Sequence, residues 1–471
     1  MADRPGWTGT PGGTWHYVLG DGAVVGPRDV PPTEVIVAFE PDAKFTRRGK
    51  LGDWQAAMEP VVAGQTLPVF VLCLALAPPL LTLAPPDFGN QLCEIAGPSG
   101  HGKSTLAFLA ASVWAGDPAR ETLGAESWLT TLEAIERQMA VHADALLVLD
   151  EANKAGSSRK TQRELIEKAI FRLSGTEGKA RHGTGVEVSG ARLLTISTSN
   201  EPLAQLLKVT PAVMEALQAR MVTFEVSWEG PLRAFDRVPH GFASERKAVE
   251  ALLRAIATYY GTPGRAMVVR LVQERAADEP KLRRRIPQFI AHFYKLTGAG
   301  DLAGSAGRAA KLFALAYAAG RLAREWGILP EAWGMISKLV PRLYALWRSA
   351  VGGAAGAAQL LRAHLDPTRE RWIDAASVKS PLKLEDFRAT AGILVREETG
   401  SVLLVPSPML RSGLPGCLEV MRALRDAGVV EGEEGQQRKL TRKAPRRLVD
   451  GPERVYRIRL DRLDELLESG G

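Results

Sequence analysis

Apolar and polar positions form two kinds of segment between about residue 51 and residue 232. Short, mainly apolar runs at 91–96, 145–149 and 192–196 are typical of strands buried on both faces of a sheet. Longer apolar segments, such as 104–114, have the length and composition of helices. Because strand-like and helical segments alternate, this part of the chain is predicted to adopt an α/β layer fold.

Different patterns flank this region. The first 50 residues are rich in Gly, Pro and aromatic residues and carry short β-like runs, which predict a small β-rich module. Residues 244–362 are helical in pattern, and the Gly- and Ala-rich segment 352–358 is typical of a loose helix or a hinge. Beyond them, two helical stretches precede a basic, β-like tail. The expected domains are a β-rich module at 1–50, an α/β core at 51–240, a helical bundle or lid at 241–365 and a basic, winged-helix-like domain at 366–471.

One uncharged segment, at 67–84, is about long enough to cross a membrane. Pro68, Pro78 and Pro79 interrupt it, and it runs almost directly into the strand at 91–96. These features favour a buried helix followed by a turn, so no membrane association is expected. The polar, glycine-rich N-terminus does not resemble a signal peptide.

Composition adds a preference for polyanions. The 471 residues carry a net charge of +7, which favours nucleic acid as a partner. The charged content of 24% is ordinary for a globular protein. The three cysteines are far apart in apolar surroundings, which indicates a reducing cytoplasm and neither a disulfide framework nor a zinc site.

A complete phosphate-binding loop with the pattern G-x-x-x-x-G-K-[ST] joins the strand at 91–96 to the helix at 104–114. Its glycines let backbone N–H groups turn toward anionic oxygens. Lys103 adds a positive charge at the β/γ-phosphates, and the Ser104 hydroxyl can ligate Mg²⁺. The succession of strand, loop and helix favours nucleotide binding over a plain glycine turn. The predicted ATP-binding residues are Gly97, Pro98, Ser99, Gly100, His101, Gly102, Lys103, Ser104 and Thr105.

The apolar run at 145–149 ends in a pair of acidic residues, Asp150 and Glu151. Asp150 is expected to hold Mg²⁺ together with Ser104, and Glu151 to polarise the attacking water. An apolar run that ends in Asp-Glu is common by itself, but here it follows a phosphate-binding loop at a distance that leaves room for a helix and a return crossover. Both residues are therefore predicted to be catalytic.

Three further polar residues are candidates for contact with the reacting phosphate. Asn200, at the end of the run that begins at Arg192, is expected to orient the lytic water, unless it only makes a turn. Arg220 precedes another apolar strand and, in a ring, could reach the γ-phosphate of the adjacent subunit; otherwise it is a surface arginine. Arg308 is a candidate for a phosphate sensor on a helical lid.

Two basic segments suit a phosphate backbone. A glycine-rich tip that carries Lys179, Arg181 and His182 predicts a projecting hairpin, the alternative being a solvated loop. Near the C-terminus a basic cluster follows a predicted helix at 418–427, which together resemble a winged helix whose wing binds nucleic acid or a ring neighbour, or is only solvated. The candidate DNA contacts in this cluster are Arg438, Lys439, Arg442 and Lys443.

Together these motifs resemble a group of helicase-like AAA+ ATPases of phages and mobile elements, which contain a domain of unknown function and include MCM-like, self-loading replicative helicases. The resemblance extends from about Trp15 through GKLGDW, GPSGHGKST, LLVLDEA, GKARHGTG and TISTSNEP to AGRLAREWG at 319–327. It implies an AAA+ core with a helical lid, a hexameric ring, and a hairpin that brings Lys179, Arg181 and His182 to DNA in a central pore. Many members end in a Ser-Thr-Gly-Glu-like sequence where this chain has STSNEP, so the role of Asn200 could belong to Thr198 or Ser199.

The expected function is therefore ATP- and Mg²⁺-dependent translocation on DNA by a replicative helicase encoded by a phage or mobile element. Single-stranded DNA would occupy the pore, and duplex DNA would contact the C-terminal domain. Two alternatives stay open. One is an AAA+ loader or remodeller of a protein partner that does not unwind DNA, and the other is a DNA-binding regulator switched by ATP.

Overall fold

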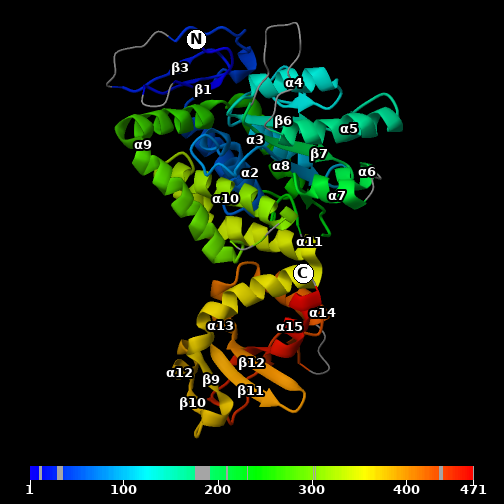
Figure 1. Cartoon of the computed structure of the whole chain (residues 1–471), viewed down its shortest axis with the longest axis vertical. Coiled ribbons are helices and arrows are strands. Elements are labelled where there is room, and N and C mark those ends of the chain that lie inside the picture. Colours follow the sequence, from blue (N-terminus) through cyan, green and yellow to red (C-terminus); the bar gives the residue numbers. More distant parts are fainter. Residues whose placement is uncertain are drawn as a thin grey trace. The chain divides into compact units, whose positions relative to one another are not determined.

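The computed structural model describes residues 1–9, 13–28, 35–175, 191–207, 211–230, 232–300, 302, 304–433 and 439–469. The chain divides into two compact units (Figure 1). The first consists of Met1–Phe293 and Asp301–Val340, and the second of Tyr294–Gly300 and Pro341–Gly471.

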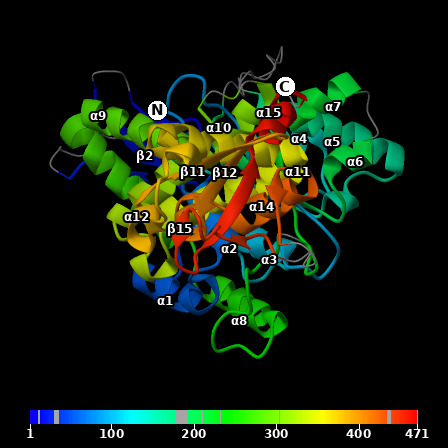
Figure 2. The same ribbon diagram turned by 90° about the horizontal axis from the view of Figure 1, so that it is seen from below.

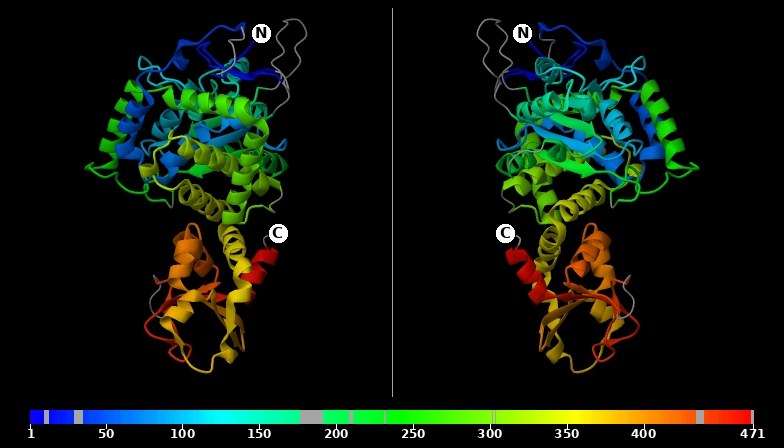
Figure 3. Two further views of the ribbon diagram at one scale, coloured as in Figure 1. Left: turned by 90° about the vertical axis from the view of Figure 1, so that its left-hand side faces the viewer. Right: turned by 90° about the vertical axis from the view of Figure 1, so that its right-hand side faces the viewer.

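The core of the first unit is a five-stranded parallel sheet with the order β5-β6-β7-β4-β8. Figures 1 and 3 show strands of this sheet among the helices of the first unit. Its central strands are buried along almost their whole length, as expected for a sheet covered on both faces. The α/β fold and the strands predicted at 91–96, 145–149 and 192–196 are confirmed. The strands are β4 (Gln91–Ala96), β5 (Glu126–Ser127), β6 (Leu146–Asp150), β7 (Leu194–Ser199) and β8 (Met221–Glu225).

Parallel strands need crossover connections, and helices provide them here. α3 (Lys103–Ala111) begins at the last glycine of the phosphate-binding loop, and its side chains are mostly buried. α5 (Arg159–Ser174) buries Ile166, Ile170 and Leu173 in a hydrophobic core with Leu147 of β6. The other short helices of this layer are α4 (Leu132–Val141), α6 (Leu203–Leu207) and α7 (Pro211–Gln218).

The uncharged segment at 67–84 is a buried helix, α2 (Thr66–Ala75), followed by a 3₁₀ turn at Pro78–Leu80, as predicted. Every residue of α2 is buried, and the helix packs against α3 and α10 (Gly304–Glu325). Pro68 lies in the first turn of α2, where a missing N–H costs no helical hydrogen bond. No helix within the described ranges is both long and apolar enough to span a bilayer.

The N-terminal residues form a small antiparallel sheet of β1 (Gly6–Thr8), β2 (His16–Val18) and β3 (Val24–Val25). Tyr17 of β2 is buried, and its hydroxyl donates to the carbonyl oxygen of Asp144 at 2.7 Å. The backbone N–H of Trp7 donates to the Asp144 carboxylate at 3.0 Å. These bonds attach the small sheet to the turn that precedes β6.

The segment predicted to be helical between 244 and 362 contains long helices. They are α8 (Glu245–Thr258), α9 (Thr262–Thr297), α10 and α11 (Ile336–Leu365). Another helix, α1 (Leu51–Val62), lies much earlier in the chain, directly before α2. α11 is broken at Gly353, which has φ 53°, within the segment expected to be a loose helix or hinge. Glycine tolerates this conformation because it has no Cβ.

The second unit contains a mixed sheet with the order β13-β16-β12-β11-β9, and β14 also pairs with β16. In Figure 2, β11 and β12 can be followed beside the red strand β16. The strands are β9 (Trp372–Asp374), β11 (Gly392–Glu397), β12 (Gly400–Pro406), β13 (Val430–Glu431), β14 (Arg442–Lys443) and β16 (Arg454–Arg459), with a separate pair of β10 (Leu382–Lys383) and β15 (Val449–Asp450). The helices are α12 (Leu384–Ala389), α13 (Ser407–Gly413), α14 (Cys417–Asp426) and α15 (Leu460–Ser469).

The helix predicted at 418–427 corresponds to α14, but the β11–β12 hairpin lies in a part of the chain where only helical stretches were expected before the tail. The expectation was wrong there because alternate residues of β11, Ile393 and Val395, are buried, which is the periodicity of a strand. Together with Val402 and Leu404 of β12 they form a hydrophobic core.

All three cysteines are free and buried. Burial raises the pKa of Cys73 to about 12 and raises those of Cys93 and Cys417 as well.

Candidate nucleotide-binding site

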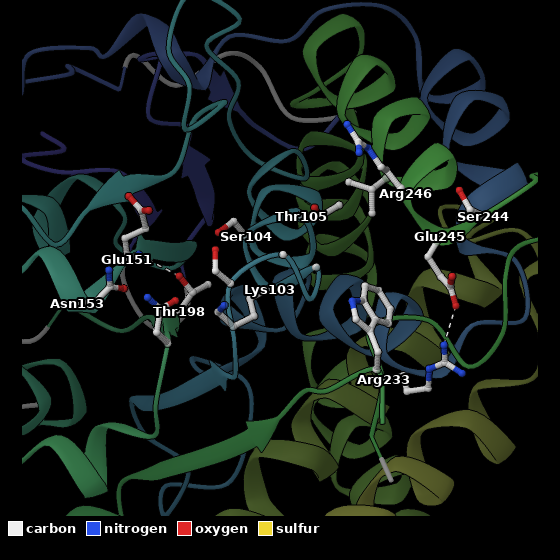
Figure 4. Close-up of a pocket in the computed structure, with 16 residues that line it drawn as sticks. Lys103, Ser104, Thr105, Glu151, Asn153, Thr198, Arg233, Ser244, Glu245 and Arg246 are labelled. Atoms are coloured by element: carbon white, nitrogen blue, oxygen red, sulfur yellow. Dashed lines mark hydrogen bonds and ion pairs between the residues drawn. The ribbon is translucent and has the colours of Figure 1, made fainter. Parts of the chain in front are cut away.

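A pocket of about 590 Å³ opens at the carboxyl ends of β4, β6 and β7 (Figure 4). The carboxyl ends of parallel strands share one edge of a sheet, so the loops that follow them converge there. The lining residues come from four segments of the first unit: Ser99, Gly100, Gly102, Lys103, Ser104 and Thr105; Glu151 and Asn153; Thr198 and Asn200; and Trp228, Arg233, Ser244, Glu245, Arg246 and Val249.

Glycines shape the predicted phosphate-binding loop. Gly97, Gly100 and Gly102 have φ values of 146°, 82° and 84°. A Cβ on Gly97 would lie 2.1 Å from the carbonyl oxygen of Val226, so no larger residue fits without a shift of the backbone. Gly102 is the N-cap of α3, whose first N–H groups have no partner within the helix. The loop can therefore present backbone donors and the positive end of a helix dipole to an anion.

Lys103 of the loop motif is also the first residue of α3. Its ammonium donates to the carbonyl oxygen of Pro98 at 2.8 Å, and the residue is only 6% exposed. Burial lowers the pKa of Lys103, while the charges of Asp150 and Glu151 act in the opposite direction. A largely buried ammonium without a bonded carboxylate is stabilised by an incoming anion such as a nucleotide phosphate.

Asp150 and Ser104 lie together beside the loop. Asp150 is buried, and burial raises the pKa of its carboxyl, whereas hydrogen bonds from Thr198 and Ser104 lower it. A hydroxyl and a carboxylate in contact are oxygen ligands of the kind that Mg²⁺ prefers, the remaining positions being filled by phosphate oxygens and water. The residues that were predicted to hold Mg²⁺ therefore fit that ion.

The backbone turns sharply at Glu151, the residue directly after β6. It has φ 63° and ψ 62°, the left-handed conformation that costs a residue with a side chain about 1–3 kcal/mol. Its N–H donates to the Thr198 hydroxyl at 2.9 Å, which helps to hold the turn. The carboxylate is 41% exposed on the pocket wall and pairs with Lys154. Such local strain is typical of functional sites.

The residues at the end of β7 divide between two environments. Asn200 and Thr198 line the pocket, and the Thr198 hydroxyl donates to Asp150. The Ser199 hydroxyl instead donates to Glu94 at 2.6 Å and does not line the pocket. Asn200 and Thr198 are thus placed to contact the reacting phosphate or water, and Ser199 is not.

Arg220 and Arg308 do not line this pocket. The Arg220 guanidinium donates to the carbonyl oxygen of Ala216 at 2.8 Å and lies 5.0 Å from the ring of Phe171. Arg220 precedes β8, so it lies at the amino ends of the strands, opposite the pocket.

The expectation that Arg308 contacts phosphate is not met within this pocket. Its carbonyl oxygen accepts from the side chain of Gln91, the first residue of β4, at 2.6 Å, again at the amino edge.

Seven pocket residues were not predicted from the sequence: Asn153, Trp228, Arg233, Ser244, Glu245, Arg246 and Val249. The Arg233 guanidinium lies 5.7 Å from the Trp228 ring and forms an ion pair with Glu245 at 2.7 Å. The Trp228 ring also contacts the His101 ring of the loop in a tilted arrangement, with 5.6 Å between the ring centroids. Because β8 is parallel to β4, the segment after β8 returns to the phosphate edge of the sheet. That pairing is known only from the structure, so no local sequence signal identified these residues.

The predicted DNA contacts are only partly described. Lys179, Arg181, His182 and Arg438 lie outside the described residues. Lys439 pairs with Glu433 at 3.6 Å, while Arg442 bonds to the carbonyl oxygen of Gly432 and lies 3.8 Å from Glu431. Lys443 is exposed, as are Arg446 and Arg447, two further cations of the same segment.

Comparisons with known proteins agree with this architecture. Residues 1–189 match the domain of unknown function DUF927. None of the curated proteins compared with the chain matches it. A solved structure described as "SCCmec type IV Cch - active helicase" is similar, with a TM-score of 0.52 and 16% sequence identity over 99% of this chain and 80% of that chain. The chain is thus similar in fold to that helicase over nearly all of its length.

Proposed function

We propose that the protein is an AAA+ ATPase that translocates on DNA as a replicative helicase of a phage or mobile element. The observation that carries this proposal is the convergence of Lys103, Asp150 and Glu151 on one pocket at the carboxyl edge of a parallel sheet. The strand order supports it, because β7 lies between β4 and β6 and so brings Thr198 and Asn200 between the phosphate-binding loop and Glu151. The similarity in fold to a helicase and the match to DUF927 favour the same function.

In this mechanism each residue has a limited role. The loop N–H groups and Lys103 bind the β- and γ-phosphates. Ser104 and Asp150 would hold Mg²⁺, and the ion would supply neutralisation of phosphate charge. Glu151 accepts a proton from the attacking water, and Asn200 orients that water. Positioning and charge neutralisation supply most of the acceleration in phosphoryl transfer.

The second part of the proposal is a hexameric ring. Arg220 lies at the edge of the sheet opposite the pocket, so it does not serve the site of its own chain. In a ring it would complete the site of the adjacent subunit, as an arginine finger does.

The third part is contact with DNA through two surfaces. Lys179, Arg181 and His182 would contact single-stranded DNA in the pore. In the second unit, Lys439 and Arg442 already face acidic residues, so they are less available to DNA phosphates. The proposed duplex contact is therefore the exposed Lys443, together with the exposed Arg446 and Arg447 that follow it closely in sequence.

The decisive experiment is an ATP-dependent strand-displacement assay with the wild type and the Lys179→Ala/Arg181→Ala variant. The wild type is expected to unwind, and the variant to lose unwinding while its basal ATP turnover persists, because the pocket is untouched. A matched control is Lys160→Ala/Lys168→Ala, which removes two exposed charges of α5. DNA-stimulated ATP turnover by the wild type without unwinding would contradict the helicase and favour a loader or an ATP-switched regulator.

A further inference from the structure

Glu94 is a fully buried carboxylate in the strand that leads into the phosphate-binding loop. It has no exposed surface and lies opposite Ser197 of β7 and Thr223 of β8 in the central sheet. No ion pair to Glu94 occurs within the described ranges, and the charged neighbour that influences it most is another acid, Glu225. A carboxylate without a cation is costly to bury, so its hydrogen bonds must offset that cost.

Three donors satisfy the carboxylate. Oε1 accepts from the Ser199 hydroxyl at 2.6 Å and from the Leu203 backbone N–H at 2.7 Å. Oε2 accepts from the Thr223 hydroxyl at 2.8 Å. The two oxygens therefore have separate tasks, since Oε1 binds the segment after β7 and Oε2 binds β8.

The two donors to Oε1 lie on either side of one short turn. Ser199 is the last residue of β7, Leu203 is the first of α6, and Asn200 lies between them on the pocket wall. The carbonyl oxygen of Ser199 also accepts the N–H of Gly97, the first glycine of the phosphate-binding loop, at 3.1 Å. A single carboxylate oxygen thus joins both ends of the turn to the strand that carries the loop.

We propose that Glu94 is a positioning residue that fixes the turn between Ser199 and Leu203, so that Asn200 faces the reacting phosphate in register with the loop. The catalytic consequence rests on the proposed ATPase function, whereas the structural consequence can be measured without nucleotide. Buried charged groups bound by several donors are costly to disturb, so the turn should loosen when the carboxylate is removed.

The test compares variants that remove one hydroxyl each from the same carboxylate. Ser199→Ala removes a bond to the turn, and Thr223→Val, the matched control, removes the bond to β8. Amide hydrogen exchange of a peptide covering residues 200–206 is measured without ATP, and ATP turnover and KM are measured separately. Ser199→Ala and Glu94→Ala should exchange faster, by about tenfold for Glu94→Ala, and should lower kcat with little change in KM. Thr223→Val should change neither, and Glu94→Gln, which keeps one acceptor oxygen, should restore protection relative to Glu94→Ala.

Equal changes in exchange for Ser199→Ala and Thr223→Val would overturn the proposal, since they would indicate a role in general packing. Unchanged exchange in a folded Glu94→Ala protein would do the same. If Glu94→Ala does not fold, the Ser199 and Thr223 pair decides alone. Absence of ATP turnover in the wild type would contradict the proposed function, while the exchange data would still decide the role of Glu94.

Discussion

The Thr198 hydroxyl donates a hydrogen bond to Oδ1 of Asp150 at 2.5 Å. The same hydroxyl oxygen accepts the backbone N–H of Glu151, so one side chain of β7 orients both acidic residues at the end of β6. The two strands are neighbours in the sheet, and β7 pairs with β4 on its other side. The acidic pair is therefore held in place by the strand that separates it from the phosphate-binding loop.

Replacing Thr198 with Val should lower ATP turnover by about tenfold, because removal of the hydroxyl leaves the Glu151 N–H unpaired and eliminates a bond that lowers the pKa of Asp150. The Mg²⁺ concentration needed for half-maximal turnover should also rise. Thr195→Val on the same strand is the matched control, since the buried Thr195 hydroxyl has no hydrogen-bond partner among the described atoms. Equal turnover in the two variants, measured across a Mg²⁺ titration, would show that Thr198 has no special role.

Glu151→Gln should bind ATP with nearly wild-type affinity but hydrolyse it at least about a hundredfold more slowly. The amide keeps the shape of the side chain and leaves Asp150 and Lys103 intact, but it cannot accept the proton of the attacking water. A nucleotide-binding titration together with a steady-state ATPase assay separates the two effects. Glu164→Gln, an exposed change on α5, should behave like the wild type. Normal turnover in Glu151→Gln would remove this residue from the mechanism.

Arg220→Ala should bind ATP but hydrolyse it poorly if its guanidinium completes the site of a neighbouring subunit. Mixing this variant with Lys103→Ala should then restore part of the activity, because some interfaces combine an intact Lys103 site with an intact Arg220. Turnover is measured over a range of mixing ratios, with native mass spectrometry to verify mixed oligomers. Mixed oligomers without any rescue would argue against a role in trans.

Removing Lys443, Arg446 and Arg447 together should weaken duplex binding and flatten its salt dependence, by roughly 0.9 in log–log slope for each DNA phosphate that the variant can no longer neutralise. Lys439→Ala serves as the comparison, because Lys439 is already paired with Glu433 and should contribute less. Fluorescence anisotropy at several salt concentrations gives the slopes. If the triple variant keeps the wild-type slope, the duplex contact lies elsewhere.

Burial raises the pKa of Glu94 from 4.5 to about 7, with hydrogen bonds from Ser199, Thr223 and Leu203 acting against the shift and the charge of Glu225 adding to it. Between these two values the folded state keeps a proton on Glu94 that the unfolded state has released. The contribution of Glu94 to the free energy of unfolding is therefore fully present below pH 4.5 and is lost as pH rises through 7. Over this pH window the free energy of unfolding of the wild type should fall by up to about 3 kcal/mol relative to that of Glu94→Gln. Urea unfolding of both proteins at pH 5, 6 and 8 measures this difference. If the free energies of unfolding of the two proteins change with pH in the same way, the raised pKa of Glu94 is contradicted.

The features that could be predicted from the sequence are those encoded in contiguous residues. The strand at 91–96 and the phosphate-binding loop combine an apolar run with fixed glycine spacing, and Asp150 and Glu151 follow the next apolar run directly. Features that depend on which strands become neighbours could not be predicted. Trp228 and Arg233 reach the pocket only because β8 is parallel to β4, and Arg308 misses it because α10 meets β4 at the opposite end.

Glu94 illustrates the same limit within one strand. A single acid in the run QLCEIA is a visible departure from an apolar pattern, but its partners come from β7, α6 and β8. The β11–β12 hairpin was missed for a different reason. Burial alternates only over residues 393–395 of β11, and residues 402–406 of β12 are all buried, so neither strand carries the long alternation that identifies a half-buried strand from sequence.

The burial of Cys73, Cys93 and Cys417 has a practical consequence. With their pKa values raised, these thiols are almost entirely protonated at neutral pH and shielded from reagents. A cysteine introduced at an exposed position away from the proposed DNA contacts, such as Lys160 of α5, would therefore react selectively with a maleimide dye in the otherwise native chain. Single-molecule fluorescence could then test whether the protein moves along DNA without first constructing a cysteine-free background.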